Sequence, residues 1–147
     1  MKVHEVMTRD VRVAAPTQSI RDAAKLMSGI DVGAVPVRDA GRLVGIITDR
    51  DIAVRGVAAG MLPETPIARI MSSDLSYCYD DQEVEEVAHS MSGLKVRRLL
   101  VLDRRERLVG IVSLGDLATK HNGSMAGNAL AGVSIPGGAH SQDRADR

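Results

Sequence analysis

The sequence has very few aromatic residues, and this scarcity excludes one class of partner. Among 147 residues there is no Phe and no Trp, and Tyr77 and Tyr79 are the two tyrosines. Single-stranded nucleic acid is usually held by bases that stack on aromatic side chains. Lys plus Arg and Asp plus Glu each number 19, so the formal net charge is zero and no overall basic field attracts nucleic acid or an anionic membrane. We therefore expect no nucleic-acid partner.

Cysteine and long apolar runs are also scarce. Cys78 is the single cysteine, which rules out an internal disulfide and fits a reducing compartment. No apolar run approaches the ~20 residues that span a bilayer, and the opening residues MKVHEVMTRD lack the apolar core of a secretory signal. We expect a cytoplasmic protein that has no membrane partner.

Metal-binding and catalytic motifs are absent as well. The four histidines are scattered and Cys78 stands alone, so no paired spacing of metal ligands occurs. The glycine-rich phosphate loops and the nucleophile elbow of common enzyme families are missing too. The sequence therefore predicts no metal site, no catalytic residues and a protein that is not an enzyme.

What the sequence does contain is a repeat of itself. Val44–Ala53 reads VGIITDRDIA, and Val109–Ala118 reads VGIVSLGDLA, 65 residues later. Earlier in the chain the offset is 64, because one extra residue near Glu106 lengthens the second copy. Residues 1–60 and 61–122 are the expected repeats, and residues 123–147, rich in Gly, Ala and Ser, are expected to be mostly disordered.

Each repeat shows the same local pattern. Apolar residues at helical spacing run from Ile20 to Met27 and from Val84 to Met91, and Gly29 and Gly93 are the expected helix ends. Strand-like runs precede each helix, a hairpin follows it, and a last helix begins near Thr48 or Ser113. The expected strands are Val11–Ala15, Ala34–Val37 and Leu43–Ile47 in one repeat, and Leu75–Tyr79, Arg98–Leu102 and Leu108–Val112 in the other.

Each repeat is therefore β-α-β-β-α, and at roughly 50–55 residues it is too small to bury much surface alone. We expect the sheets of the two repeats to pack together with pseudo-two-fold symmetry. The predicted fold class is α/β (α+β), with both repeats in one module.

The hydroxyl and aspartate that end each hairpin have two interpretations. Thr48 with Asp51, and Ser113 with Asp116, have the spacing of a capping box, in which two side chains satisfy the free N–H groups of a helix start. The same helix start, with its positive dipole end, also suits a phosphate, while an aspartate suits the hydroxyls of a ribose. The sequence favours capping but leaves a nucleotide site open.

The paired repeats resemble a tandem CBS-domain protein, or Bateman module, of the stand-alone bacterial type. The resemblance covers residues 1 to about 121 and rests on VGAVPVRDAGRLVGIITDRDI and VRRLLVLDRRERLVGIVSLGDL. It implies two clefts that bind adenosine nucleotides such as AMP, ADP, ATP, NAD or S-adenosylmethionine, and pairing of two modules into a homodimer.

Carried over position by position, the resemblance implies one set of nucleotide-binding residues. Asp51 and Asp116 would hold ribose hydroxyls, and Thr48 and Ser113 would contact phosphate. Arg98, with Arg97 as its neighbouring candidate, would neutralise phosphate. The adenine would be enclosed by Val13, Ala14, Ala15, Val35, Pro36, Val37, Tyr77, Cys78, Tyr79, Leu99, Leu100 and Val101.

Some positions depart from the family pattern and make the two sites unequal. Gly33 and Ala34 stand where the second repeat has Arg97 and Arg98, so phosphate charge would come from one side. Leu100 stands where proline is usual.

We therefore expect a non-catalytic regulatory sensor of an adenosine nucleotide, acting on an unknown protein partner. The alternative is a structural or protein-interaction CBS module without a nucleotide ligand. Metal-linked stress signalling is a third reading, to which the histidine spacing gives little support.

Overall fold

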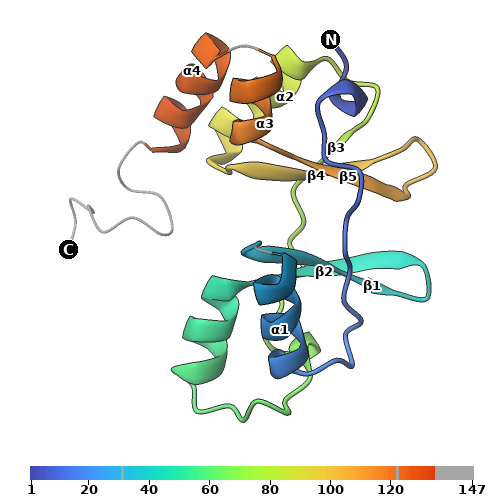
Figure 1. Ribbon diagram of the computed structural model, residues 1–147, viewed down its shortest axis with the longest axis vertical. Coiled ribbons are helices and arrows are strands. Elements are labelled where there is room, and N and C mark those ends of the chain that lie inside the picture. The colour runs from blue at the N-terminus through green and yellow to red at the C-terminus, as the bar shows by residue number, and fades with distance from the viewer. Residues whose placement is uncertain (31, 122, 135–147) are drawn as a thin grey trace. The chain divides into compact units, whose positions relative to one another are not determined.

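The chain forms two compact units in its computed structural model, which describes residues 1–30, 32–121 and 123–134 (Figure 1). Unit 1 joins Met1–Val11 to the chain from Ser76 onward, and unit 2 is Arg12–Leu75. The compact units therefore do not coincide with the expected repeats 1–60 and 61–122. The short segment that begins each repeat belongs to the unit that contains the rest of the other repeat.

Unit 2 is built on a two-stranded hairpin. Its elements are α1 (Ile20–Ile30), β1 (Ala34–Asp39), β2 (Arg42–Thr48), the π-helix η2 (Asp51–Val57) and the 3-10 turn η3 (Ile67–Arg69). Strands β1 and β2 are antiparallel, and Ala34 lies opposite Thr48. The predicted hairpin is confirmed.

Unit 1 has a three-stranded sheet in the order β3-β4-β5. Strand β3 is parallel to β4, and β4 is antiparallel to β5. Its elements are η1 (Val3–Glu5), β3 (Tyr77–Tyr79), α2 (Val84–Leu94), β4 (Arg98–Leu102), β5 (Leu108–Ser113), α3 (Leu114–Lys120) and α4 (Gly123–Val133).

The first strand of the β-α-β-β-α pattern forms fully in one repeat only. In unit 2, Ala14 makes a single parallel bridge with Val37, so the expected strand Val11–Ala15 is wrong. In unit 1 the equivalent strand is β3, and the N–H of Asp80 just after it donates to the Leu102 carbonyl at 3.0 Å. Pro16 occupies the position of Asp80 in the first repeat, and because proline has no N–H the ladder stops there.

The expected helix ends at Gly29 and Gly93 are also wrong, since both glycines lie inside α1 and α2. Helix α2 ends instead at Lys95, whose φ of 56° places it in the left-handed region. The Lys95 N–H donates to the Ser92 carbonyl, so a non-glycine residue takes the role that the pattern assigned to glycine.

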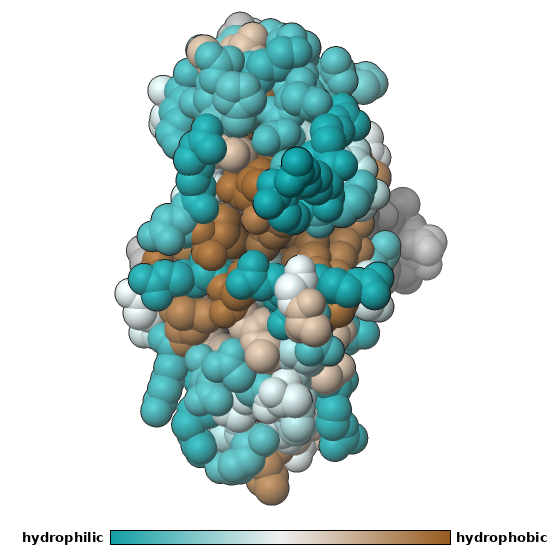
Figure 2. Space-filling model, turned by 90° about the vertical axis from the view of Figure 1, so that its right-hand side faces the viewer, coloured by the Kyte–Doolittle hydropathy of each residue, from teal (hydrophilic) through white to brown (hydrophobic). Residues whose placement is uncertain are grey.

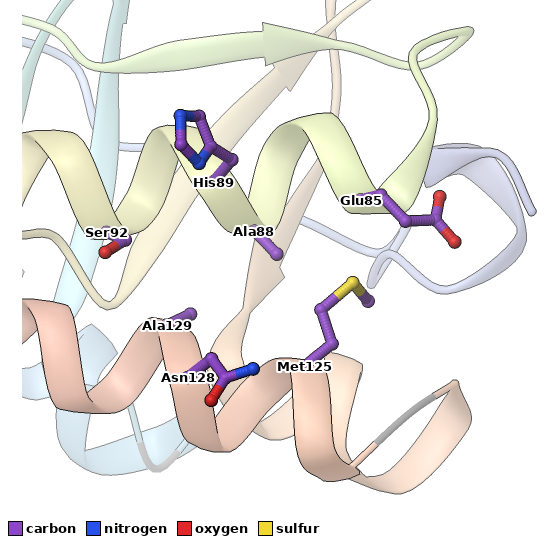
Figure 3. A pocket seen from close by; sticks show the side chains of 7 residues that line it. All are labelled: Glu85, Ala88, His89, Ser92, Met125, Asn128 and Ala129. Atoms are coloured by element: carbon purple, nitrogen blue, oxygen red, sulfur yellow. The ribbon is translucent and has the colours of Figure 1, made fainter.

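The expectation of disorder from residue 123 fails for its first eleven residues, which form α4. Ala126 and Ala129 are buried in the core of unit 1, and Figure 3 shows Ala88 of α2 and Met125 of α4 pointing toward one another. A helix with no charged residue gives no amphipathic signal, yet its small side chains allow close packing. Residues 135–147 of the expected tail lie outside the described residues.

Each unit is completed by an exchanged segment, a name used here for residues 3–8 and residues 67–72. Val3 and Val6 are buried in the core of unit 1, and Ile67 and Ile70 in that of unit 2. The two segments dock alike: Thr8 bridges Ile111, and Ser72, its equivalent in the repeat, bridges Ile46. The sequence pattern did not reveal this exchange.

A glycine in the second hairpin strand makes room for each exchanged segment. A Cβ at Gly45 would lie 2.8 Å from the Ser72 carbonyl oxygen, and one at Gly110 would lie 2.8 Å from that of Thr8. Methionine sulfurs, of Met71 and Met7 respectively, lie equally close. These glycines are the G of the repeated RLVGI, so close backbone approach explains why that residue recurs.

We predict that Gly110→Ala destabilises unit 1 by about 1–3 kcal/mol, because the methyl group overpacks against backbone that cannot yield. Gly93→Ala is the matched control. Its Cβ would meet nothing within 4 Å, and inside a helix the change should stabilise by roughly 0.5–1 kcal/mol. Urea unfolding monitored by circular dichroism measures both, and equal stability of the two variants would contradict the docking geometry.

Candidate functional site

The predicted hydroxyl–aspartate pairs are both capping boxes. The Ser113 N–H donates to Asp116 Oδ2 at 2.9 Å, and the Asp116 N–H donates to Ser113 Oγ at 3.1 Å. Thr48 and Asp51 exchange the same two bonds at 3.0 Å each. The capping interpretation is therefore confirmed in both repeats.

Capping leaves part of each pair available for a ligand. Ser113 Oγ accepts a hydrogen bond in the cap, so its own O–H proton can still be donated elsewhere. Asp116 uses Oδ2 for the cap, and its Oδ1 faces the Lys120 ammonium at 3.4 Å. A carboxylate oxygen accepts more than one hydrogen bond, so the same residues can cap the helix and meet ligand hydroxyls.

In unit 1 the sheet topology gathers the predicted residues at one edge. Because β3 and β4 are parallel and β5 runs against them, the starts of β3 and β4 and the end of β5 lie at the same edge. Arg98 lies opposite Ser113, and the Leu114 N–H donates to the Arg97 carbonyl at 3.0 Å. Tyr77 begins β3 at this edge.

The electrostatics of this edge favour an anion. Arg97 and Arg98 are exposed, and no hydrogen bond or ion pair joins either side chain to another residue in the described part of the chain. Lys120 lies one turn beyond Asp116. Lys120 is paired with that carboxylate, but the charges of Arg97 and Arg98, where β4 begins opposite Ser113, are uncompensated within the described residues, an arrangement that suits a phosphate.

Unit 2 brings the equivalent residues together, but with an acidic residue, Asp49, among them. Ala34 lies opposite Thr48, and the Asp49 N–H donates to the Gly33 carbonyl at 2.9 Å. The Asp49 carboxylate fills the space beside Gly33, where a Cβ would lie 2.8 Å from Oδ2. An acidic group therefore stands where unit 1 has arginine, and it disfavours phosphate.

Several predicted adenine-contacting residues point into the cores instead. Strand alternation buries every second side chain of a strand against the helices. The residues whose side chains belong to a hydrophobic core are Ala14, Val35, Val37, Cys78, Leu99 and Val101. Only the backbone groups of these residues can meet a ligand. Pro36 and Leu100 are also buried but lie outside both core clusters, and Val13 and Ala15 are partly exposed.

The two tyrosines form the exposed part of β3. Their rings meet edge to face with centroids 5.8 Å apart, and Tyr77 is 46% exposed. Tyr79 is held in place because its hydroxyl donates to Glu106 at 2.8 Å and the Arg104 guanidinium lies 4.2 Å from its ring centroid. The hydrogen bond to Glu106 raises the pKa of Tyr79 to about 12.

Cys78, between them, is a core residue without reactive character. Burial, with a smaller contribution from the Asp80 charge, raises the pKa of its thiol to about 12. The thiol therefore stays protonated at neutral pH and is a poor nucleophile or metal ligand.

The histidines do not gather into a metal centre in the described residues, which contain no group of three His, Cys, Asp or Glu side chains placed to hold an ion. His121 instead pairs with Glu85 at 3.3 Å. His89 lines a groove of ≈ 320 Å³ between α2 and α4, and in Figure 3 its ring points away from α4.

Comparison with known proteins supports the arrangement of the repeats. The CBS domain family model matches residues 3–56 and 67–122. The chain belongs to the CBS-domain family. It is 41% identical over 133 residues to the CBS domain-containing protein YhcV of Bacillus subtilis, covering 90% of this chain and 94% of that one.

Two solved CBS structures carry ligands of different kinds. The CBS domain pair of protein MJ0100, in complex with 5′-methylthioadenosine and S-adenosyl-L-methionine, is 30% identical with a TM-score of 0.73, covering 84% of this chain and 98% of that one. Hypoxic Response Protein I with two coordinated zinc ions is 32% identical with a TM-score of 0.73, covering 82% and 98%. No helix in the described part of our CBS pair is long and apolar enough to cross a membrane.

Sequence reasoning missed two sets of residues at these sites. Gly45 and Gly110 were missed, although their recurrence in RLVGI is a signal of close backbone approach. Arg55 was missed, and Lys120 was predicted to favour the helix dipole or reach a phosphate, whereas each of the two contacts the aspartate four residues earlier. The signal for them was weak, because one repeat has Arg and the other Lys.

We predict that Ser113→Ala destabilises unit 1 by about 1 kcal/mol, because the Asp116 N–H loses its acceptor at the helix start. Ser134→Ala is a matched control, since Ser134 is exposed and follows the end of α4. Thermal unfolding measures both. A Ser113→Ala melting temperature equal to that of the control would mean that the cap contributes nothing.

Proposed function

We propose that this CBS pair is a non-catalytic regulatory module that binds an adenosine-containing ligand. The observation that carries the proposal is the edge of unit 1, where Arg98 lies opposite Ser113 at the start of the helix that Asp116 caps, and where the side chains of Arg97 and Arg98 pair with no other residue in the described part of the chain. The ligands of the MJ0100 domain pair support the choice of an adenosine compound. AMP, ADP, ATP and NAD all combine a ribose for Asp116 with phosphate for Ser113 and the arginines.

The ligand's parts match the chemistry of the edge. Two ribose hydroxyls are donors and the Asp116 carboxylate is a pure acceptor. The phosphate oxygens are acceptors, and both the Ser113 hydroxyl and the Arg97 guanidinium can donate hydrogen bonds to them. The Tyr77 ring, exposed and braced by Tyr79, offers a face or edge to a base.

We propose further that the two repeats are unequal in use. Phosphate-bearing ligands go to the edge with Arg97 and Arg98, because Asp49 would repel phosphate at the equivalent edge of unit 2. Thr48 and Asp51 can still receive the ribose of an uncharged nucleoside there.

Calorimetry on ligand-free protein tests the proposal with AMP, ATP, NAD, S-adenosylmethionine and 5′-methylthioadenosine. We expect Asp116→Asn to weaken binding about tenfold or more, the equivalent of roughly 1.4 kcal/mol, because an amide cannot accept as a carboxylate does. The Asp116→Asn variant should remain about as stable as the unmutated protein, since asparagine retains an acceptor oxygen for the Ser113 N–H. Absence of heat with every ligand would favour the alternative, a structural or protein-interaction CBS module.

The charge assignment has its own test. Arg97→Ala should weaken ATP about tenfold, an effect of roughly 1.4 kcal/mol, and leave 5′-methylthioadenosine, which has no phosphate, nearly unchanged. Arg105→Ala is the matched control, because it removes the same charge from the β4–β5 turn at the opposite end of the strands. Equal losses of ATP affinity in the two variants would contradict a phosphate contact at Arg97.

The module is also proposed to act as a cytoplasmic homodimer that signals to a protein partner. Large apolar side chains are exposed on unit 2, among them Val57 at 71% and Leu62 at 70%, and Figure 2 shows apolar surface among hydrophilic residues on one face. Sedimentation velocity that shows only monomer at micromolar concentration would contradict the homodimer.

A further inference from the structure

The cation four residues after each aspartate makes a second contact, to the exchanged segment. Lys120 Nζ lies 3.4 Å from Asp116 Oδ1 and donates to the Val6 carbonyl at 3.1 Å. In unit 2, Arg55 Nη1 lies 3.9 Å from Asp51 Oδ1 and donates to the Ile70 carbonyl at 3.1 Å. Val6 and Ile70 are equivalent positions of the repeat.

The recurrence of this bridge with different residues points to a role for the contact. Lysine and arginine differ in length and shape, yet each reaches the aspartate and the same carbonyl of its exchanged segment. A cation placed only for the helix dipole would need neither contact. Arg55 also lies 3.4 Å from the Met71 carbonyl, the next residue of the segment.

The aspartate in this bridge is the residue on which the ribose contact depends. A ligand hydroxyl that donates to Asp116 Oδ1 shares an oxygen with the Lys120 ammonium. When Oδ1 is shared, the attraction between the Asp116 carboxylate and the Lys120 ammonium becomes weaker. The ammonium is then held less firmly in the position from which it donates to the Val6 carbonyl. The bond of the Thr8 N–H to the Ile111 carbonyl, at 2.8 Å, lies two residues further along the same segment.

We propose that Lys120 and Arg55 are positioning residues that couple each aspartate to the docking of the exchanged segment, so that ligand binding in one unit changes the hold on a segment that leads to the other repeat. The regulatory role of these contacts rests on the proposed function. The segment held by Lys120 runs on into unit 2 at Arg12, and the one held by Arg55 runs on into β3.

A double-mutant cycle read by amide hydrogen exchange tests the coupling without any ligand. In Lys120→Met, which keeps most of the side-chain length, exchange at Met7 and Thr8 should become about threefold to tenfold faster relative to Val101 in β4. Asp116→Asn alone should also make hydrogen exchange at Met7 and Thr8 faster. Combined with Lys120→Met, it should cause no further increase in the exchange rate, because the bridge is already lost. Additive effects, or faster exchange spread evenly to Val101, would overturn the proposal.

Two controls separate coupling from general destabilisation. Ser113→Ala weakens the same helix start but leaves the bridge, so its effect on Met7 and Thr8 should add to that of Lys120→Met. Arg55→Met is the mirror variant. It should speed exchange at Met71 and Ser72, whose N–H groups donate to Ile67 and Ile46, and spare Met7 and Thr8. A failure of this mirror pattern counts against the coupling.

Adding AMP then tests the regulatory role. In the parent protein AMP should speed exchange at Met7 and Thr8 at least twofold relative to Val101, and in Lys120→Met it should bind without this effect. The same response in both proteins would overturn the relay while leaving nucleotide binding in place. A third outcome is that the double-mutant cycle shows coupling but AMP does not bind. That outcome would overturn the regulatory role and the proposed AMP ligand, but not the coupling between Lys120 and Asp116.

Discussion

Each hydrophobic core of this protein depends on a short segment that begins the other repeat. Val3 and Val6 are fully buried in one core, and Ile67 and Ile70 in the other. Burying one such side chain stabilises by about 1.5–3 kcal/mol, which is a large share of the stability of so small a unit. The glycine in each second strand makes room for this segment, and the cation four residues after each aspartate donates to its backbone.

The same helix starts serve the fold and the candidate site, and they do so without conflict. The capping box uses one carboxylate oxygen and the lone pairs of the hydroxyl, while the other oxygen and the hydroxyl proton remain for further bonds. The role of these residues in stabilising the helix start is therefore compatible with a role in ligand binding. The two repeats differ in the residues beside the cap, Asp49 in one and Arg97 in the other, and we propose that this difference selects ligands by charge.

The sequence predicted most of the local structure because repetition doubled every signal. Both hairpins, both amphipathic helices and both caps were found from spacing and turn residues. The exchange was missed because periodicity reports which face of an element is buried and not which partner buries it. Helix α4 was missed because alanine and glycine carry no amphipathic pattern, although Ala126 and Ala129 are buried. The strand at Ala14 is reduced to one bridge because Pro16 lacks the N–H that would continue the parallel ladder, an effect that apolar periodicity does not register.

Of the candidate site, the sequence could identify the residue types but not their directions. Asp116, Ser113 and Arg98 were placed correctly at one strand edge because a cap and a strand start are local features. Val35 and Leu99 were assigned to an adenine pocket, and their side chains lie in the cores. A strand of unbroken apolar residues hides which alternate positions face the helices.

The reciprocal exchange has a consequence for how such a protein could arise. A single repeat of this kind carries a segment that cannot complete its own core, and it lacks the segment that could. Two separate copies would satisfy each other by trading segments, as a domain-swapped pair does. Fusion of the two copies turns that trade into an internal one, and it frees each copy to change alone. Two identical chains could not differ from one another in sequence. The fused repeats do differ: Pro16 shortens the sheet of one unit, and Arg97 and Arg98 place positive charge at the edge of the other.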